Sequence, residues 1–283
     1  MARFDWYQAT VGAPPPDIRA CLSSMVDAPK WVPQRRGTQG YAWADHLEGP
    51  EGTAAKLWWG GSHTFPHVVL SGGDAHAGAM LLREAFPEVQ AVSRVDVCID
   101  YSEPGAYDKL QALAVDVARE DKIKVRTNGD HLLTMEGRTV YLGATTSHTQ
   151  LRIYEKDAQL RAQFANDPAK LATVPDHLAR FEAQVRPQTP AARYNASKAE
   201  PLALMGSAKW LRKLMGLVAG LDIEPFLAGK VWRQSDDDRA MCALLAQYGG
   251  LLERVKQDLG SWECVGKQIG DDLAVRKRAK GRA

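Results

Sequence analysis

Three segments of the chain alternate strictly between apolar and polar residues, and this alternation constrains the fold more than any other feature. They are residues 94–100, 150–156 and 180–186. Successive side chains of a strand point to opposite faces of a sheet, so each segment predicts a β-strand with one apolar and one polar face. If the three strands lie in one antiparallel sheet, their apolar faces pack on helices and their polar faces emerge together on the other side.

The polar faces of these strands carry carboxylates and a phenol. Asp96 and Asp100 belong to the first segment, Tyr154 to the second and Glu182 to the third. A half-exposed sheet that merely shows charges to water is the alternative, but three strands with an acid or phenol in mid-face favour a site. Carboxylate oxygens suit Mg²⁺ or Mn²⁺, so the sequence predicts a divalent ion beside the phenol, where it would polarise a phosphodiester.

Two cations frame the tyrosine. Arg152 and Lys156 share the face of Tyr154 because they lie two residues before and after it. A phenol with a pKa of about 10 is a poor nucleophile, and flanking positive charge favours the phenolate while attracting a phosphate. The pattern is typical of a tyrosine that attacks a phosphodiester, although strand tyrosines also serve simply to cover a core.

The remaining pattern predicts further strands and helices. Before residue 190, a strand, helix, strand, strand, helix order occurs twice, which suggests a repeat of residues 1–90 and 91–190. Asp17 and Asp74 are the expected N-caps of two helices. Residues 139–143 and 150–156 are expected to pair as a hairpin. Helices are predicted beyond residue 190, including 200–219, 223–226, 235–247 and 251–259. The predicted fold class is α+β: a central antiparallel sheet with helices on one face, built of two β-α-β-β-α units and followed by a helical C-terminal segment.

Composition narrows the function classes. The net charge is only +2, and no apolar run approaches the ~20 residues of a membrane span. The N-terminal residues do not resemble a signal peptide, so we expect a cytoplasmic protein without a membrane partner. The four cysteines form no C-x-x-C pair, and the seven histidines form no metal-binding pair. No G-x-G-x-x-G, P-loop or serine nucleophile elbow is present, so neither a nucleotide cofactor nor a serine hydrolase is indicated.

The ordered set of motifs resembles the replication initiation factor family, whose members initiate rolling-circle replication of filamentous phages and small plasmids and are related to conjugative relaxases. The resemblance covers roughly residues 4–190 and opens with Phe4-Asp5-Trp6. The motifs that carry it are Arg94-Val95-Asp96-Val97-Cys98-Ile99-Asp100, Thr139-Val140-Tyr141-Leu142-Gly143, Leu151-Arg152-Ile153-Tyr154-Glu155-Lys156 and Arg180-Phe181-Glu182.

This resemblance implies a metal-dependent, site-specific endonuclease that nicks one strand of an origin, with Tyr154 joined to the 5′ phosphate, and later religates it. Arg152 and Lys156 would orient the phosphate. By position, Asp96 and Glu182 are the implied ligands of Mg²⁺ or Mn²⁺, with Asp100 as a further candidate. Carboxylates replace the histidine pair of other rolling-circle initiators, which agrees with the lack of such a pair.

The implied organisation is a nicking domain at residues 1–190, a helical segment at 191–272 and a basic tail at 273–283. The DNA-binding candidates are Arg94, Arg186, Arg276, Lys277 and Arg278. The implied partners are origin DNA, single-stranded at the nick, and a host helicase and polymerase, with the protein acting as a monomer or dimer. Two alternatives stay open: a DNA-binding replication accessory protein that does not cut, and a conjugative relaxase. A tyrosine recombinase is poorly supported, because the Arg/His set of those enzymes has no counterpart here.

Overall fold

The computed structural model describes residues 1–49, 52–228 and 236–280, without the side chains of residues 236–243, 246 and 275–280. The chain divides into two compact units, Met1–Lys230 and Val231–Ala283. The first contains the sheet and the second contains α9 (Asp236–Leu259) and α10 (Trp262–Lys280).

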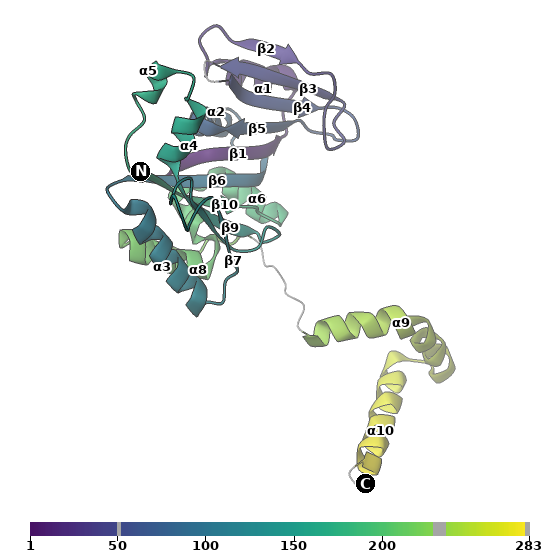
Figure 1. Ribbon diagram of the computed structural model, residues 1–283. Coiled ribbons are helices and arrows are strands. Elements are labelled where there is room, and N and C mark those ends of the chain that lie inside the picture. The colour runs from purple at the N-terminus through teal and green to yellow at the C-terminus, as the bar shows by residue number, and fades with distance from the viewer. Residues whose placement is uncertain (50–51, 229–235, 281–283) are drawn as a thin grey trace. The chain divides into compact units, whose positions relative to one another are not determined.

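The first unit is built on a single sheet that, in its described part, has ten strands, all paired antiparallel (Figure 1). Their order across the sheet is β2-β3-β4-β5-β1-β6-β10-β9-β8-β7. The strands are β1 (Arg3–Val11), β2 (Lys30–Pro33), β3 (Trp43–Gly49), β4 (Gly52–Trp59), β5 (His67–Ser71), β6 (Gln90–Ser102), β7 (Val125–Asn128), β8 (Thr139–Leu142), β9 (Thr149–Glu155) and β10 (Leu178–Val185).

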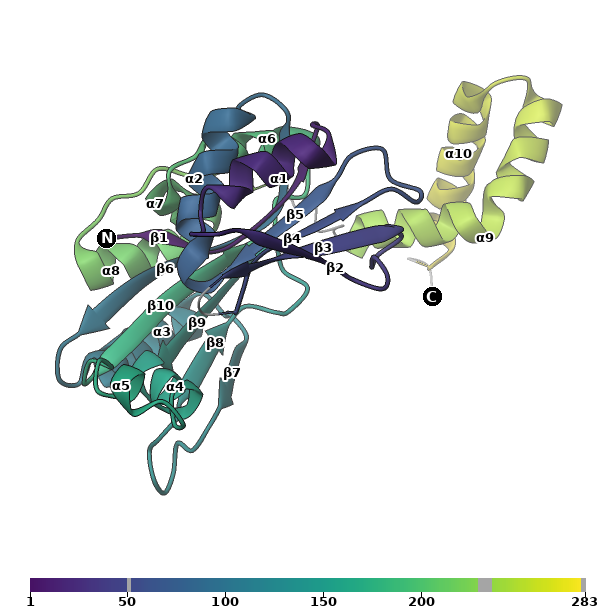
Figure 2. The same cartoon turned by 90° about the horizontal axis from the view of Figure 1, so that it is seen from above.

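The helices of this unit lie mainly against one side of the sheet (Figures 1 and 2). They are α1 (Pro15–Ser23), α2 (Ala75–Ala85), α3 (Ala106–Glu120), α4 (Lys156–Gln163), α5 (Pro168–Leu171), α6 (Pro190–Lys198), α7 (Pro201–Leu204) and α8 (Lys209–Ala219), with 3-10 turns η1 (Gly72–Asp74) and η2 (Met205–Ser207). The sheet is antiparallel, helices cover its apolar face, and further helices follow in the C-terminal segment of the chain. The predicted α+β fold class is therefore confirmed. The internal repeat stays a prediction.

The core forms where the apolar faces of the strands meet these helices. Val97, Ile153 and Phe181, from three adjacent strands, belong to one cluster of buried residues with Leu82 of α2 and Leu214 of α8. The alternation therefore assigned the inward faces of these strands correctly. Burial of apolar surface at about 25 cal/mol per Å² stabilises this arrangement and fixes the register, since a one-residue slip would turn every side chain over.

Several predicted elements differ from the structure. Asp17 lies in the first turn of α1, whose N-cap is Pro14, and the Asp74 side chain makes no capping hydrogen bond although the residue is the N-cap of α2. The helix expected at 200–219 is interrupted at Gly206, where an added Cβ would lie 2.1 Å from the Glu224 carbonyl oxygen. The amide of Phe226 donates to the Gly206 carbonyl oxygen at 3.1 Å, so residues 223–226 pack here without forming the predicted helix.

The second unit also differs from expectation. Residues 236–259 form one continuous helix, α9, where the sequence predicted two, and α10 was not predicted as a helix. No helix in the described part of the chain combines the length and hydropathy needed to span a membrane.

Candidate active site on the polar face of the sheet

Pairing between β6, β10 and β9 aligns the polar residues in rows across the sheet. Arg180 of β10 lies opposite Asp100 of β6 on one side and Tyr154 of β9 on the other. In the next row, Glu182 lies opposite Arg152. Directly opposed residues of antiparallel strands have their Cβ atoms about 5 Å apart, so this register brings the phenol, the carboxylates and the arginines together.

Tyr154 lies at the centre of this group. Its Oη donates a hydrogen bond to Glu182 Oε2 at 3.1 Å, and Arg152 forms an ion pair with the other carboxylate oxygen. The Arg152 guanidinium carbon lies 5.2 Å from the centre of the Tyr154 ring, and Lys156 Nζ lies 5.7 Å from it. The structure thus brings together four residues that the sequence singled out, three of them around the phenol.

The electrostatics of the phenol oppose the expected activation. The pKa of Tyr154 is raised above its ordinary value, first by burial and then by the negative charge of Glu182, which together outweigh Arg180 and Arg152. Burial also raises the pKa of Glu182 to about 7, although Arg152 acts against this. The pKa of Lys156 is lowered, mainly by burial and then by Arg180. Arg152 does favour the phenolate, as expected, but burial has the larger effect and the phenol stays protonated in this arrangement.

The predicted metal-binding carboxylates each pair with arginine. Asp96 accepts from Arg94 Nε at 2.8 Å and from Gln184 Nε2 at 3.4 Å. Asp100 accepts from Arg180 at 2.6 and 2.9 Å and from Arg3 at 2.5 Å. Among the described residues, no group of three or more His, Cys, Asp or Glu side chains is placed to hold a metal ion. The carboxylates supply oxygen donors of the right kind for Mg²⁺ or Mn²⁺. In the arrangement described, however, each carboxylate is neutralised by an arginine.

Two residues of the site were missed by sequence reasoning. Arg180 is only 5% exposed and its Nη1 donates to Asp5 Oδ1 at 2.5 Å, which links β10 to β1. The alternation places Arg180 on the same face as Glu182, so its position was available from the sequence. Asp5 lies between Phe4, opposite Val97, and Trp6, opposite Asp96, where the register of β1 shifts by one residue. No pattern in the sequence signals such a bulge.

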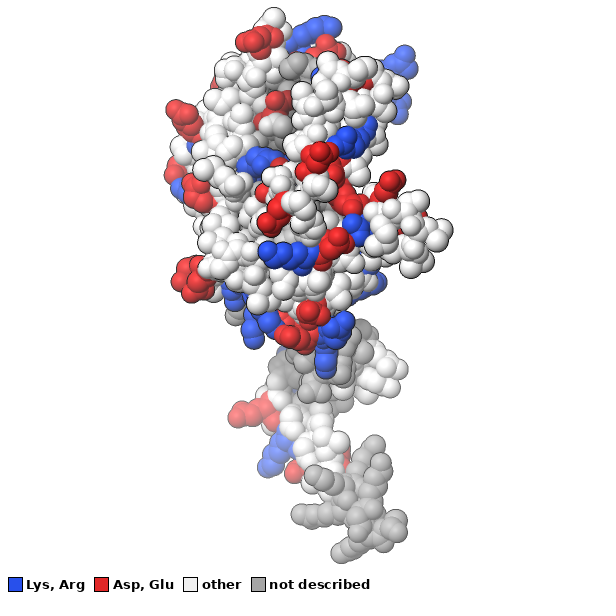
Figure 3. Space-filling model, turned by 60° about the vertical axis from the view of Figure 1, so that its left-hand side comes forward, with Lys and Arg blue, Asp and Glu red and all other residues white. Residues whose placement is uncertain are grey.

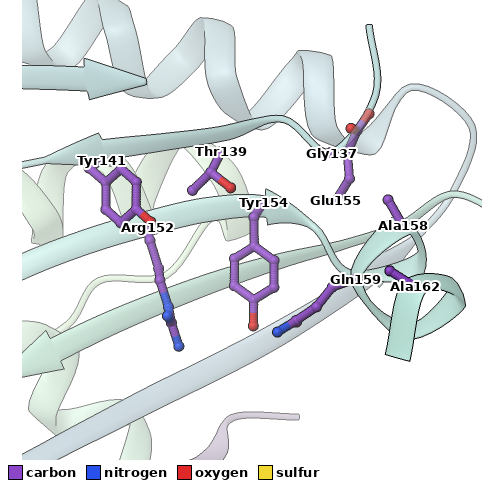
Figure 4. Close-up of a pocket in the computed structure, with 9 residues that line it drawn as sticks. All are labelled: Gly137, Thr139, Tyr141, Arg152, Tyr154, Glu155, Ala158, Gln159 and Ala162. Carbon is purple, nitrogen blue, oxygen red and sulfur yellow. The ribbon is translucent and has the colours of Figure 1, made fainter. Parts of the chain in front are cut away.

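A cavity of about 320 Å³ opens beside the phenol (Figure 4). Thr139 and Tyr141 of β8 border one side, and the start of α4 closes the other, so this helix lies over the polar face. The side chains of Arg152 and Gln159 lie on either side of Tyr154. Gln159 is itself held by Lys156 Nζ, which donates to its Oε1 at 2.9 Å. The full lining comprises Gly137, Thr139, Tyr141, Arg152, Tyr154, Glu155, Ala158, Gln159 and Ala162. The volume is at the lower end of the range for small-molecule sites.

The predicted DNA-binding residues differ in their contacts. Arg94 is paired with Asp96 and stacks 4.5 Å from the Trp6 ring centre. Arg186 donates to the Thr145 carbonyl oxygen at 2.7 Å near the surface. Positive and negative side chains are interspersed over the face of the first unit seen in Figure 3. The side chains of Arg276, Lys277 and Arg278 in α10 lie outside the described residues.

The fold defined by this sheet has a counterpart among solved structures. The chain is similar to the rolling circle replication initiator protein from Geobacillus stearothermophilus, with a TM-score of 0.51 and 19% sequence identity over 84% of this chain and 90% of that chain. The resemblance expected from the motifs is confirmed at the level of the fold. No protein-family model and no curated protein matches the chain.

Proposed function

We propose that this chain initiates rolling-circle replication by nicking single-stranded DNA at an origin, with Tyr154 as the nucleophile. The observation that carries the proposal is the hydrogen bond of 3.1 Å from the Tyr154 phenol to the Glu182 carboxylate, at the edge of a cavity that also contains Arg152. A nucleophile, a proton acceptor and a cation for the phosphate are thereby within one site. The fold shared with a rolling circle replication initiator supports the same function.

The proposed reaction is a transesterification. Tyr154 Oη attacks the scissile phosphorus and forms a bond to the 5′ phosphate, while the bond to the 3′ oxygen breaks and that oxygen takes a proton from water and leaves as a hydroxyl. Because the raised pKa keeps the phenol protonated, its proton must be removed during attack, and Glu182 Oε2 accepts it. Arg152 orients the phosphate, and the second transfer reverses these steps to reseal the strand without a nucleotide cofactor.

A divalent ion fits the donor chemistry of the site. Asp96 and Glu182 are the residues that would hold Mg²⁺ or Mn²⁺, with Asp100 as a further candidate, and each would exchange its arginine partner for the ion. Bound there, the ion would supply charge stabilisation at the non-bridging phosphate oxygens. The released 3′ hydroxyl would serve a host polymerase, with a helicase separating the strands ahead of it.

The second candidate is a DNA-binding replication accessory protein that does not cut. Two observations favour this alternative. Arginines neutralise the carboxylates, and the raised pKa of Tyr154 keeps its phenol protonated, so the site is not activated for attack in this arrangement.

Both candidates are tested by one experiment. The protein is mixed with Mn²⁺ and a pool of fluorescent random-sequence single-stranded oligonucleotides, and products are separated on a denaturing gel. We expect a covalent protein–DNA adduct from the wild type and from the matched control Tyr101→Phe, whose residue does not line the cavity, and none from Tyr154→Phe. An adduct from Tyr154→Phe would refute the assignment of the nucleophile, and binding without any adduct would favour the accessory role.

A further inference from the structure

The loop between β7 and β8 projects from the sheet (Figure 2), and it carries two adjacent exposed leucines. Leu132 is 89% exposed and Leu133 is 87% exposed, more than any other large apolar side chain of the described residues except Met1. Isolated exposed apolar residues are common in proteins, but two adjacent ones at the tip of a projecting loop form a small apolar surface.

The tip is ordered by one carboxylate. Asp130 accepts hydrogen bonds from the amides of Leu132 and Leu133, both at 2.8 Å, and from the amide of Thr134 at 2.9 Å. These backbone bonds hold the pKa of Asp130 well below its usual range, so the carboxylate stays ionised and keeps the turn closed. Gly129 has a φ of +89° and packs so closely on Gly137 that a Cβ would lie 2.1 Å from the Gly137 carbonyl oxygen. The backbone of the tip is therefore fixed before any ligand arrives, which lowers the entropy cost of binding.

The loop begins at the rim of the candidate active site. Gly137, at its end, lines the cavity beside Tyr154, and Thr139 lies directly opposite Tyr154 across β8 and β9. Since a strand rises about 3.3 Å per residue, the six residues from Leu133 to Thr139 span at most about 20 Å, and Tyr154 lies about 5 Å further, across to β9. Arg126 of β7 stacks 4.4 Å from the centre of the ring of Tyr141, a residue that lines the cavity, which adds a cation beside the cavity.

We propose that Leu132 and Leu133 form a wedge that inserts into a base step of duplex DNA beside the scissile phosphate. Apolar side chains such as leucine partly unstack a base step and kink the duplex when they insert. The wedge opens the duplex so that one strand reaches Tyr154. This inference rests on the proposed function.

The small size of the apolar surface at the loop tip favours a base step over other binding partners. A stable protein interface buries about 800 Å² on each partner, far more than two leucine side chains can supply. Membrane association also scales with buried apolar area and generally needs an amphipathic helix or a lipid anchor. One base step needs only one or two inserted side chains. The loop also adjoins the cavity proposed to hold DNA.

The first test compares duplex and single-stranded substrates. The wild type, the double variant Leu132→Ser/Leu133→Ser and the control Leu227→Ser, whose leucine is 77% exposed, are given a cleaved sequence in both forms. We expect the double variant to nick the duplex at least tenfold more slowly than wild type and the single strand within twofold of it. Leu132→Phe/Leu133→Phe retains an apolar wedge and should restore duplex nicking. The wedge would be refuted if the wild type and the serine double variant nick the duplex at equal rates, or if the double variant loses the same fraction of its nicking rate on both substrates.

The second test does not require cleavage. In a Tyr154→Phe background, 2-aminopurine is placed singly within about eight base steps of the cleavage position, because about 25 Å spans roughly seven to eight steps of 3.4 Å. We expect the protein with both leucines to raise the fluorescence at one or two adjacent positions and the serine double variant to leave it unchanged. If no sequence is cleaved, a duplex selected for binding is used as the substrate instead. A failure of nicking can then be distinguished from a failure of the wedge. The same rise with both proteins would refute the inference.

Discussion

Replacing Glu182 with glutamine should change how the stability of the protein depends on pH. Glu182 is 1% exposed, and burial raises the pKa of its carboxyl from 4.5 to about 7. A group with a raised folded-state pKa binds its proton more tightly in the folded state. Its contribution is thus fully present below the unfolded pKa of 4.5 and is lost as the pH rises through 7.

The magnitude follows from these two pKa values. Between pH 5 and pH 8, ionisation of Glu182 should lower the free energy of unfolding by about 2.5 kcal/mol, given about 1.4 kcal/mol per pKa unit and partial titration at both ends. Glu182→Gln cannot ionise, so this part of the pH dependence disappears. Its absolute stability falls as well, because Arg152 loses its partner, and the informative quantity is therefore the difference between the two pH values.

Urea denaturation at pH 5 and pH 8 measures this difference. The control is Glu48→Gln, which replaces a side chain that is 51% exposed. From pH 5 to pH 8, we expect the free energy of unfolding of the wild type and of this control to fall by about 2 to 3 kcal/mol more than that of Glu182→Gln. If all three proteins show the same change, Glu182 does not titrate as its burial implies, and the raised pKa of this carboxyl is refuted.

Two further predictions concern the core and the thiols. Phe181→Ala removes a fully buried ring from β10 and should lower the free energy of unfolding by about 3–5 kcal/mol, whereas Phe65→Ala, at a ring that is 51% exposed, should change it by less than about 0.5 kcal/mol in urea titrations. Burial raises the pKa of the Cys98 thiol to about 12, so a maleimide should label exposed Cys264 in the native protein and reach Cys98 only after unfolding, as peptide mass spectrometry would show. Equal losses for the two phenylalanine variants, or native labelling of Cys98, would contradict the burial described here.

Alternation of residue types was enough to predict the central part of the sheet. It placed Phe181, Val97 and Ile153 in the core and Tyr154 with Glu182 on the opposite face, because the side-chain period of a strand is two. The expected hairpin of residues 139–143 and 150–156 was also confirmed, as β8 pairs with β9.

The electrostatic state of the site could not be predicted in this way. Whether Arg152 lowers or burial raises the pKa of Tyr154 depends on how deeply each group lies, which the order of residues does not specify. The register shift at Asp5 depends on the pairing of β1 with a strand about 90 residues later in the chain, and only that pairing brings Asp5 to Arg180. Sequence reasoning therefore identified which side chains share a face, but not which of them neutralise one another.

The strand order has a consequence for synthesis of the protein on the ribosome. Tyr154 on β9 reaches Asp96 on β6 only through β10, which lies between those strands in the sheet and ends at Val185. A nascent chain that stops before Leu178 therefore contains the phenol, Asp96 and Asp100, but it lacks β10 and with it Glu182. Contacts between such distant segments form late, so an incomplete translation product has no assembled site.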